Sequence, residues 1–238
     1  MAYRNSHMEK GKGGIYHSSF ASDKHRKMMW RLEKRYITKI IERHFPNSPD
    51  AHLDFACGTG RLLAFLEPMC KKSTGVDISE EMLSVAKTHT ATDLVHADLT
   101  ADDVLGDVQF DLITAFRFFP NAEPLLRLQA LEVLVKHLRN NGVLLFNNHR
   151  NNESLLARFR RRAFGNSYRG MNIEEITSLM ANAGLEVISI DSAGILHDSF
   201  SSDFFPGSLF YCIERLMGVI PFTRSYGYNQ IIVCKRRD

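Results

Sequence analysis

The chain has 238 residues, 44% of them hydrophobic, and a formal net charge of +3. This length fits one large domain, or one domain with appendages, and the hydrophobic content suffices for a sizeable core. The mild positive charge does not require a nucleic-acid partner. Four cysteines (Cys57, Cys70, Cys212 and Cys234) have neither zinc-site nor disulfide-framework spacing, so no metal is expected.

The N-terminal segment is glycine-rich and polar, and we expect residues 1–19 to form a flexible arm. It lacks the apolar core of a signal peptide, and no run in the chain approaches the ~18 apolar residues of a membrane span. A cytoplasmic location is the expectation. Apolar residues at helical spacing predict a helix from Ser22 to His44, which Pro46 and Pro49 end.

Predicted strands and helices then alternate, which favours an α/β fold. The strands are predicted at Ala51–Ala56, in a run ending at Asp77, and at Leu94–Ala97, Phe110–Phe116, Val143–Phe146, Leu185–Ile190 and Tyr228–Cys234. The helices are predicted from the glycine turn through Leu66, from Glu80 to His89 with Ser79 as N-cap, from an Asn121 cap through Leu138, and from Asn172 to Ala183, ending at Gly184. Asn141-Gly142 is predicted to form the turn into the fifth strand.

Three of these strands end near an acidic residue: Asp54, Asp77 and Asp98. Parallel strands would bring the three carboxylates to one edge of the sheet, where open α/β folds bind ligands. Gly58 and Gly60 allow a tight turn and a close backbone approach to that ligand. Because Leu63 stands where a dinucleotide fingerprint needs a small residue, the pattern favours a nucleoside with hydroxyls and an amine over a pyrophosphate.

Four ordered motifs resemble those of the class I S-adenosylmethionine-dependent methyltransferases of the small-molecule type. They are the Asp-Phe-Ala-Cys-Gly-Thr-Gly turn, Val-Asp-Ile-Ser, Ala-Asp-Leu and Phe-Asp-Leu-Ile-Thr-Ala-Phe, within about 53–148. The resemblance implies a Rossmann-like, seven-stranded, mostly parallel sheet with helices on both faces and an N-terminal helical lid. It also implies S-adenosylmethionine as cofactor and S-adenosylhomocysteine as product.

By the same resemblance, Asp54, Gly58 and Gly60 would hold the methionine end, Asp77 the ribose and Asp98 the adenine amine. Ala56, Ile78 and Leu99, in the same motifs, are assigned to the cofactor as well. Ala56 occupies a position where many members of the superfamily have glycine. The resemblance divides the chain into an arm and lid helix (1–49) and a methyltransferase domain (50–238), with a cofactor half (50–148) and an acceptor-side half (149–238).

The candidate catalytic residue is His149, which directly follows Asn148 at the end of the predicted fifth strand. Its ordinary pKa near ~6.5 suits proton abstraction from an acceptor. The alternative is a loop histidine bonded to the backbone. Asn148, beside it, is assigned to the acceptor side.

Aromatic residues around Arg117 end the predicted fourth strand. Phe116 is assigned to the cofactor and Phe118 to the acceptor side. Each of them would form a wall of the site, against the adenosyl group or against the acceptor. The alternative is that these aromatic residues simply pack in the core. Arg117 either pairs with a carboxylate or reaches an anionic ligand.

The N-terminal arm resembles, more loosely, the tyrosine-bearing arm that small-molecule methyltransferases fold over the cofactor. Tyr16 would then contact the methionine end, together with Arg26 and Trp30, and His17 would lie on the acceptor side. A disordered arm and an ordinary helix explain the same residues.

A basic run follows the predicted fifth strand: Arg158, Arg160, Arg161, Arg162 and Arg169. It is either a solvated face or a surface for a phosphorylated acceptor or an anionic membrane. The apolar segment Phe204–Phe222 is interpreted as a cover for the acceptor pocket, as core packing or as a subunit contact. The oligomeric state is left open.

These features predict methyl transfer to a small acceptor, such as a sugar, a natural-product intermediate or another metabolite, with a hydroxyl as the preferred acceptor and no nucleic-acid partner. The alternatives are a nucleic-acid or protein methyltransferase, or a non-catalytic cofactor-binding subunit that activates a partner. Against the nucleic-acid alternative, the fourth strand lacks the Asn-Pro-Pro-Tyr type of motif used to methylate amides.

Overall fold

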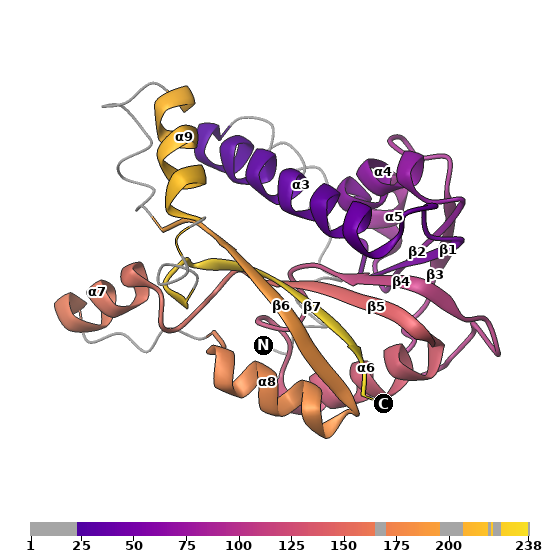
Figure 1. Ribbon diagram of the computed structural model, residues 1–238. Coiled ribbons are helices and arrows are strands. Elements are labelled where there is room, and N and C mark those ends of the chain that lie inside the picture. The colour runs from indigo at the N-terminus through magenta and orange to yellow at the C-terminus, as the bar shows by residue number, and fades with distance from the viewer. Residues whose placement is uncertain (1–22, 165–169, 196–206, 219, 221–224, 238) are drawn as a thin grey trace.

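The sheet is the organising element of the protein. The computed structural model describes residues 23–164, 170–195, 207–218, 220 and 225–237. Its seven strands lie in the order β3-β2-β1-β4-β5-β7-β6 (Figure 1). They are β1 (Ala51–Phe55), β2 (Lys72–Asp77), β3 (Asp93–His96), β4 (Phe110–Ala115), β5 (Leu138–Asn148), β6 (Leu185–Ala193) and β7 (Asn229–Arg236).

Strand direction fixes where the site lies. The strands β1 to β5 pair in parallel, whereas β7 runs antiparallel to both β5 and β6. The strands β1 to β6 therefore all end at one edge of the sheet, here called the carboxyl edge, and β7 begins there. The predicted α/β, mostly parallel, seven-stranded sheet is confirmed.

Helices cover both faces of this sheet. One face carries α3 (Lys24–His44) and α4 (Arg61–Leu66), whose Ile37, Ile40 and Leu66 pack on β4, β5 and β7. The other face carries α6 (Pro124–His137) and α8 (Ile173–Asn182), with Leu131 and Met180 in its core. A short 3₁₀ turn (Glu67–Met69) follows α4, and α5 (Glu80–Ala86) adjoins α4 through a close approach of Ala86 to Gly60.

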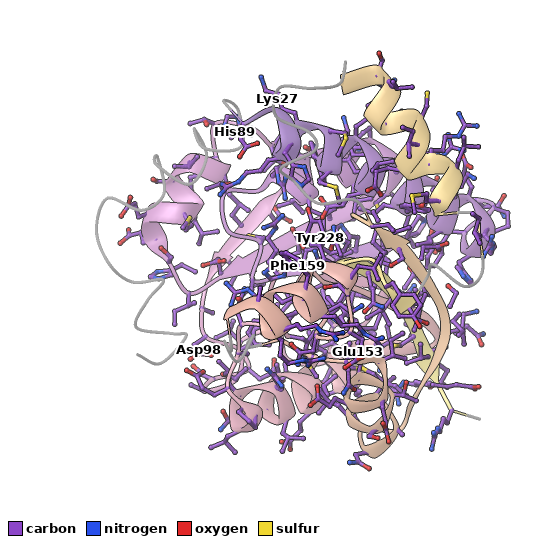
Figure 2. All side chains as sticks on the ribbon, turned by 90° about the vertical axis from the view of Figure 1, so that its left-hand side faces the viewer. Lys27, His89, Asp98, Glu153, Phe159 and Tyr228 are labelled. Carbon is purple, nitrogen blue, oxygen red and sulfur yellow. The ribbon has the colours of Figure 1, made fainter. Side chains whose placement is uncertain are left out.

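Two further helices extend the chain beyond the elements predicted from sequence. The helix α7 (Leu155–Phe164) follows β5, and α9 (Gly207–Met217) lies in the chain between β6 and β7. Figure 2 views the molecule from the side on which α7 lies, with Phe159 on that helix in the foreground. Four arginines of the basic run lie in α7, and α9 falls within the apolar segment Phe204–Phe222.

Capping explains several element boundaries. Asp23 caps α3, its side chain accepting from the Arg26 amide at 3.1 Å. Ser79 caps α5 as predicted, and Asn172 caps α8 in a reciprocal capping box with Glu175. The predicted Asn121 cap of α6 is wrong: Glu123 is the N-cap, with Pro124 in the first turn.

The predicted turn at Asn141-Gly142 is also wrong. The strand β5 begins at Leu138, which pairs with Phe110, and the register then shifts so that Val143 pairs with Leu112. Residues 139–142 form an irregularity within the strand rather than a turn before it. Gly142 fits there because a Cβ would meet the Arg139 carbonyl oxygen at 2.9 Å.

Candidate functional site

The glycine turn between β1 and α4 has three residues in the left-handed region. Ala56 has φ 56°, Gly58 φ 57° and Gly60 φ 72°. A Cβ on Gly60 would also lie 2.9 Å from the Ala86 Cβ, so this position needs glycine for both conformation and space. Ala56 bears backbone strain that a glycine would avoid, which fits the glycine that many members of the superfamily have at this position.

Asp77 ties the glycine turn to the end of β2. Its Oδ2 accepts a hydrogen bond from the Gly58 amide at 2.7 Å, and its Oδ1 accepts from the Ser79 amide at 2.8 Å. Backbone donors at these distances hold a carboxylate in one orientation. Asp77 therefore presents a fixed negative charge at the carboxyl edge.

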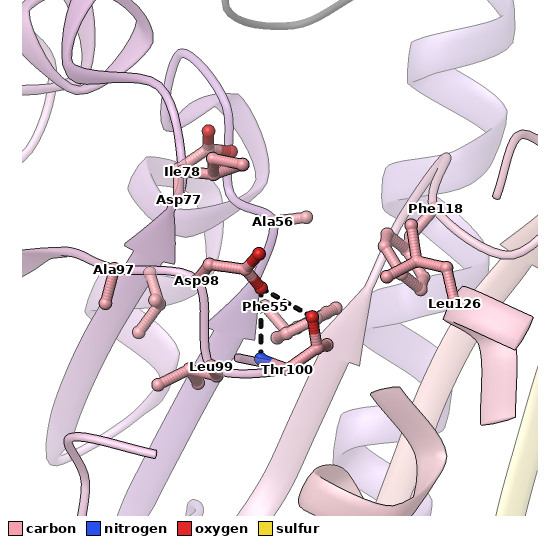
Figure 3. A pocket seen from close by; sticks show the side chains of 11 residues that line it. Phe55, Ala56, Asp77, Ile78, Ala97, Asp98, Leu99, Thr100, Phe118 and Leu126 are labelled. Carbon is pink, nitrogen blue, oxygen red and sulfur yellow. Dashed lines mark hydrogen bonds between the residues drawn. The ribbon is translucent and has the colours of Figure 1, made fainter. Parts of the chain in front are cut away.

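A pocket opens beside Asp77 (Figure 3). It comprises about 370 Å³ of space that is partly open to solvent. The lining consists of Phe55, Ala56, Val76, Asp77, Ile78, Ala97, Asp98, Leu99, Thr100, Phe118 and Leu126. Asp98 accepts from the Thr100 amide at 3.1 Å and from its hydroxyl at 2.5 Å, drawn as dashed lines in Figure 3.

The aromatic wall of this pocket is built from β1 and from the turn after β4. The Phe118 ring meets the Phe55 ring edge to face, with centroids 4.9 Å apart. Phe118 is 3% exposed and belongs to the core on the α6 face, while Phe116 packs on the α3 face. The structure thus places Phe118, rather than Phe116, at the pocket with the cofactor-assigned Ala56, Asp77, Ile78, Asp98 and Leu99.

Asp54 lies beneath the turn in a buried hydrogen-bond chain. Its Oδ1 accepts from the Thr114 hydroxyl at 2.6 Å, and that hydroxyl lies 2.9 Å from His52 Nε2, while His52 Nδ1 lies 3.1 Å from the Ser73 hydroxyl. The Asp54 Oδ2 is buried and has no hydrogen-bond partner among the described residues.

Burial sets the charge states in this chain. Loss of solvent raises the pKa of Asp54 to about 7 and lowers the pKa of His52 to about 3. His52 is therefore neutral at physiological pH, and Asp54 is close to its titration point. A cationic group near Oδ2 would favour the ionised carboxylate and provide the missing partner.

The end of β4 is fixed by two asparagine side chains. Arg117 has φ 61°, an uncommon conformation for a residue with a Cβ. Its amide donates to Asn147 Oδ1 at 2.6 Å, and its carbonyl accepts from Asn121 Nδ2 at 2.5 Å. Asn121 thus stabilises this turn rather than capping α6.

His149 follows the last residue of β5 and is partly buried. Its Nδ1 is shielded from solvent without a hydrogen-bond partner among the residues described. Burial, with the positive charges of Arg117 and Arg150, holds the pKa of His149 well below its ordinary value of 6.5. The imidazole is therefore neutral at physiological pH.

Other residues assigned from sequence lie elsewhere. Asn148 is fully buried and donates to the Met171 carbonyl at 2.8 Å and to Gln230 Oε1 at 3.0 Å. Arg26 lies at the exposed start of α3, with its Nε 3.6 Å from Asp23. Tyr16 and His17 lie outside the described residues. In the described part of the chain no cluster of His, Cys, Asp and Glu is arranged to hold a metal ion.

Sequence reasoning missed the residues that position the assigned ones. Thr114 belongs to the Phe-Asp-Leu-Ile-Thr-Ala-Phe motif, yet its hydrogen bond to Asp54 depends on the pairing of β1 with β4. Asn147 bonds Asn229 at 3.1 Å, and Asn229 bonds Glu33 at 2.7 Å, across three elements distant in sequence. The one available signal was an unusual concentration of amides at the ends of two apolar strands.

Residues 53–144, which contain the glycine turn, Asp77, Asp98 and β4, match the family model described as a methyltransferase domain. Over these residues the chain is similar to methyltransferase domains. A search of curated proteins finds no significant match.

Solved structures with the methyltransferase fold align over nearly the whole chain. The plantazolicin methyltransferase BpumL, in complex with S-adenosylhomocysteine, is 17% identical, with 99% of this chain and 95% of that chain covered and a TM-score of 0.64. A methyltransferase from Archaeoglobus fulgidus is 16% identical, with 93% and 98% covered and a TM-score of 0.64. A methyltransferase in complex with the Haloferax volcanii Trm112 activator is 19% identical, with 92% and 97% covered and a TM-score of 0.61. At these identities the similarity shows the fold.

The residues at the carboxyl edge fit S-adenosylmethionine, the cofactor that the sequence motifs imply. The buried, unpartnered Asp54 Oδ2 suits an ammonium group, and the fixed Asp77 carboxylate faces a pocket whose other walls are largely apolar. Such a pocket, with a few convergent polar groups, is typical of small-molecule sites.

Proposed function

We propose that the protein is a methyltransferase that takes the methyl group of S-adenosylmethionine and transfers it to a hydroxyl of a small acceptor, with His149 as general base. In this proposal Asp77 binds the ribose hydroxyls, Asp98 the adenine amine, and Asp54 with Gly58 and Gly60 the methionine end. Residues 50–148 form the cofactor half and residues 149–238 the acceptor-side half, with the preceding helix as lid.

The observation that carries the proposal is the buried, unpartnered Nδ1 of a neutral His149 at the carboxyl edge. In the tautomer protonated at Nε2, this nitrogen holds a lone pair that can accept a proton. An ordinary structural histidine uses its buried nitrogens in hydrogen bonds, as His52 does at both.

A weak base suffices for this chemistry. The sulfonium supplies an activated methyl group, so the protein mainly aligns the acceptor. As the bond to carbon forms, the acceptor oxygen gains positive charge and its proton becomes strongly acidic, so a neutral imidazole with a lowered pKa can remove it.

Replacing the imidazole tests this role. After an acceptor screen scored by S-adenosylhomocysteine release, His149→Ala should lower kcat on a hydroxyl acceptor by about 100- to 10,000-fold and leave cofactor affinity nearly unchanged. The exposed His89→Ala is the matched control. Because the pKa of His149 is held well below the ordinary 6.5, the wild-type rate should show no loss as the pH falls through 6.5 and should decline only at lower pH, where the imidazole becomes protonated.

The alternative acceptors give other outcomes. With an amine acceptor, alignment dominates, and His149→Ala costs far less. Wild-type turnover of a hydroxyl acceptor by His149→Ala would refute the general base. Cofactor binding without turnover on any small acceptor, but with turnover in the presence of a protein partner, would favour the activating-subunit alternative.

A further inference from the structure

Strand topology places two helices at the carboxyl edge. Because β5 ends at this edge, α7 begins there, six residues after His149. Because β6 ends and β7 begins at the same edge, α9, which lies between them in the chain, is attached there too. The surfaces of α7 and α9 therefore border the side of the molecule on which a ligand enters.

The start of α7 is firmly attached to this edge. Asn151 Nδ2 donates to the Ser225 and Gly227 carbonyls at 2.7 and 2.9 Å. The Ser154 side chain accepts from the Ala157 amide at 3.1 Å, and Ala157 is 1% exposed. The orientation of α7 about its axis is thus fixed, and the opposite side of the helix faces outward.

The outward side of α7 is apolar and basic at once. Phe159 is 63% exposed and Leu155 49% exposed, and with the exposed Ala163 they form one stripe at four-residue spacing. The exposed Arg158, Arg161 and Arg162 lie beside this stripe. Figure 2 shows Phe159 on the surface that faces the viewer. The ten residues of α7 include four arginines and no acid.

The helix α9 repeats the apolar part of this pattern. Leu209 is 45% and Leu216 68% exposed, seven residues apart and therefore on one side of the helix. Single exposed apolar residues are common, but a lengthwise apolar stripe on a helix usually has a partner. None of the described helices is long and apolar enough to cross a membrane.

We propose that the outward side of α7, defined by Leu155, Arg158, Phe159, Arg161, Arg162 and Ala163, docks on an anionic lipid surface. Arginines attract the acidic headgroups, and Phe159 and Leu155 enter the boundary between headgroups and acyl chains. Docking there turns the carboxyl edge toward the bilayer. This inference stands whether or not the acceptor is a hydroxyl.

The residue types favour lipid over other anionic partners. A single-stranded nucleic acid would use the arginines and stack a base on Phe159, but it has no use for the aliphatic Leu155 and Ala163 in the same stripe. A small phosphorylated acceptor would not require exposed apolar residues on the outer surface of a helix. Only an anionic surface with an apolar interior complements both parts of the pattern.

Vesicle binding tests the proposal. The full-length protein should bind vesicles of phosphatidylcholine mixed with phosphatidylglycerol, bind pure phosphatidylcholine vesicles far more weakly, and dissociate as salt is raised. Arg161→Gln combined with Arg162→Gln should weaken binding about 30-fold, and Phe159→Ala about tenfold. All three side chains are exposed, so the melting temperature should not change.

Matched controls lie at the opposite edge of the sheet. Lys39→Gln with Arg43→Gln removes two exposed charges from the end of α3 that leads to β1, and Val108→Ala removes exposed apolar surface just before β4. Equal losses in controls and α7 variants would overturn the proposal in favour of nonspecific charge attraction. The proposal would also be overturned if the wild type bound no vesicles, or bound neutral vesicles equally well. A third contrary result would be binding of single-stranded RNA that depends on the arginines and that Phe159→Ala leaves intact.

Discussion

The two halves of the carboxyl edge use different polar groups. In the cofactor half, β1 and β2 and the loop after β3 present the carboxylates of Asp54, Asp77 and Asp98. In the acceptor-side half, β5 and β7 present buried amides, which pair as Asn147 with Asn229 and as Asn148 with Gln230. Carboxylates are thus the polar groups at the strand ends of the first half, and paired amides are those at the ends of β5 and β7, where Asn229 also binds Glu33.

The difference follows from hydrogen-bonding capacity. An amide both donates and accepts, so neighbouring amides can satisfy one another and lock adjacent strands. A carboxylate only accepts, so it needs donors from the backbone, from a hydroxyl or from a ligand. The proposed cofactor half therefore suits a ligand rich in N–H and O–H groups. The amides of the other half hold its backbone in place, including the turn at Arg117.

Exchanging a carboxylate for an amide in the cofactor half should give the largest effect. The folded pKa of Asp54, about 7, lies above its ordinary 3.8, so the protonated form is favoured in the folded state. The contribution of Asp54 to the free energy of unfolding is therefore most favourable below pH 4, and it declines as the pH rises to 7. At pH 8 Asp54→Asn should raise the free energy of unfolding of the ligand-free protein by about 4 kcal/mol.

Urea unfolding from pH 4 to pH 8 measures this effect. The difference between Asp54→Asn and wild type should grow with pH, while the exposed Asp107→Asn should follow wild type. The stabilised variant should also bind S-adenosylhomocysteine less well, because the amide has no charge for an ammonium group. Parallel stability curves for the two proteins would show that burial of Asp54 costs nothing.

The reverse exchange in the acceptor-side half should be destabilising. Asn147→Asp keeps an acceptor for the Arg117 amide but loses the donor to Asn229 and buries an uncompensated charge. We expect a loss of about 3 kcal/mol at pH 8. The exposed Asn140→Asp is the control for the same change of charge in the same strand. If both variants unfold at the same urea concentration, the amide network does not hold this half together.

Backbone strain in the cofactor half should give the smallest effect. Ala56→Gly relieves a φ of 56° and should stabilise the protein by about 0.5 to 1 kcal/mol after the entropy cost of glycine. Ser48→Gly, at φ 64° and remote from the pocket, is the matched control and should gain a similar amount. A lower melting temperature for Ala56→Gly alone would mean that its methyl contacts in the pocket outweigh the strain.

The same contrast explains what could be predicted from sequence. The residues of the cofactor half could be predicted because its carboxylates lie in short local motifs. Gly58 and Asp77, which are joined by a hydrogen bond, are only 19 residues apart. The amide pairs could not be predicted, because Asn147 and Asn229 are 82 residues apart and meet only through antiparallel pairing. Likewise, the predictions of an Asn121 cap and an Asn141-Gly142 turn were wrong because they relied on local preferences. Tertiary contacts override these preferences at both positions.

Titration calorimetry with S-adenosylhomocysteine tests the central claim, that the acidic half of the edge is a nucleoside site for this cofactor. Wild type should bind in the low-micromolar range, roughly −8 kcal/mol, and should not bind NAD tightly. Asp77→Ala should weaken binding by about 2 kcal/mol or more, through loss of a charge-assisted hydrogen bond, whereas the exposed Asp107→Ala should bind like wild type. Tight NAD binding with no S-adenosylhomocysteine binding would contradict the account.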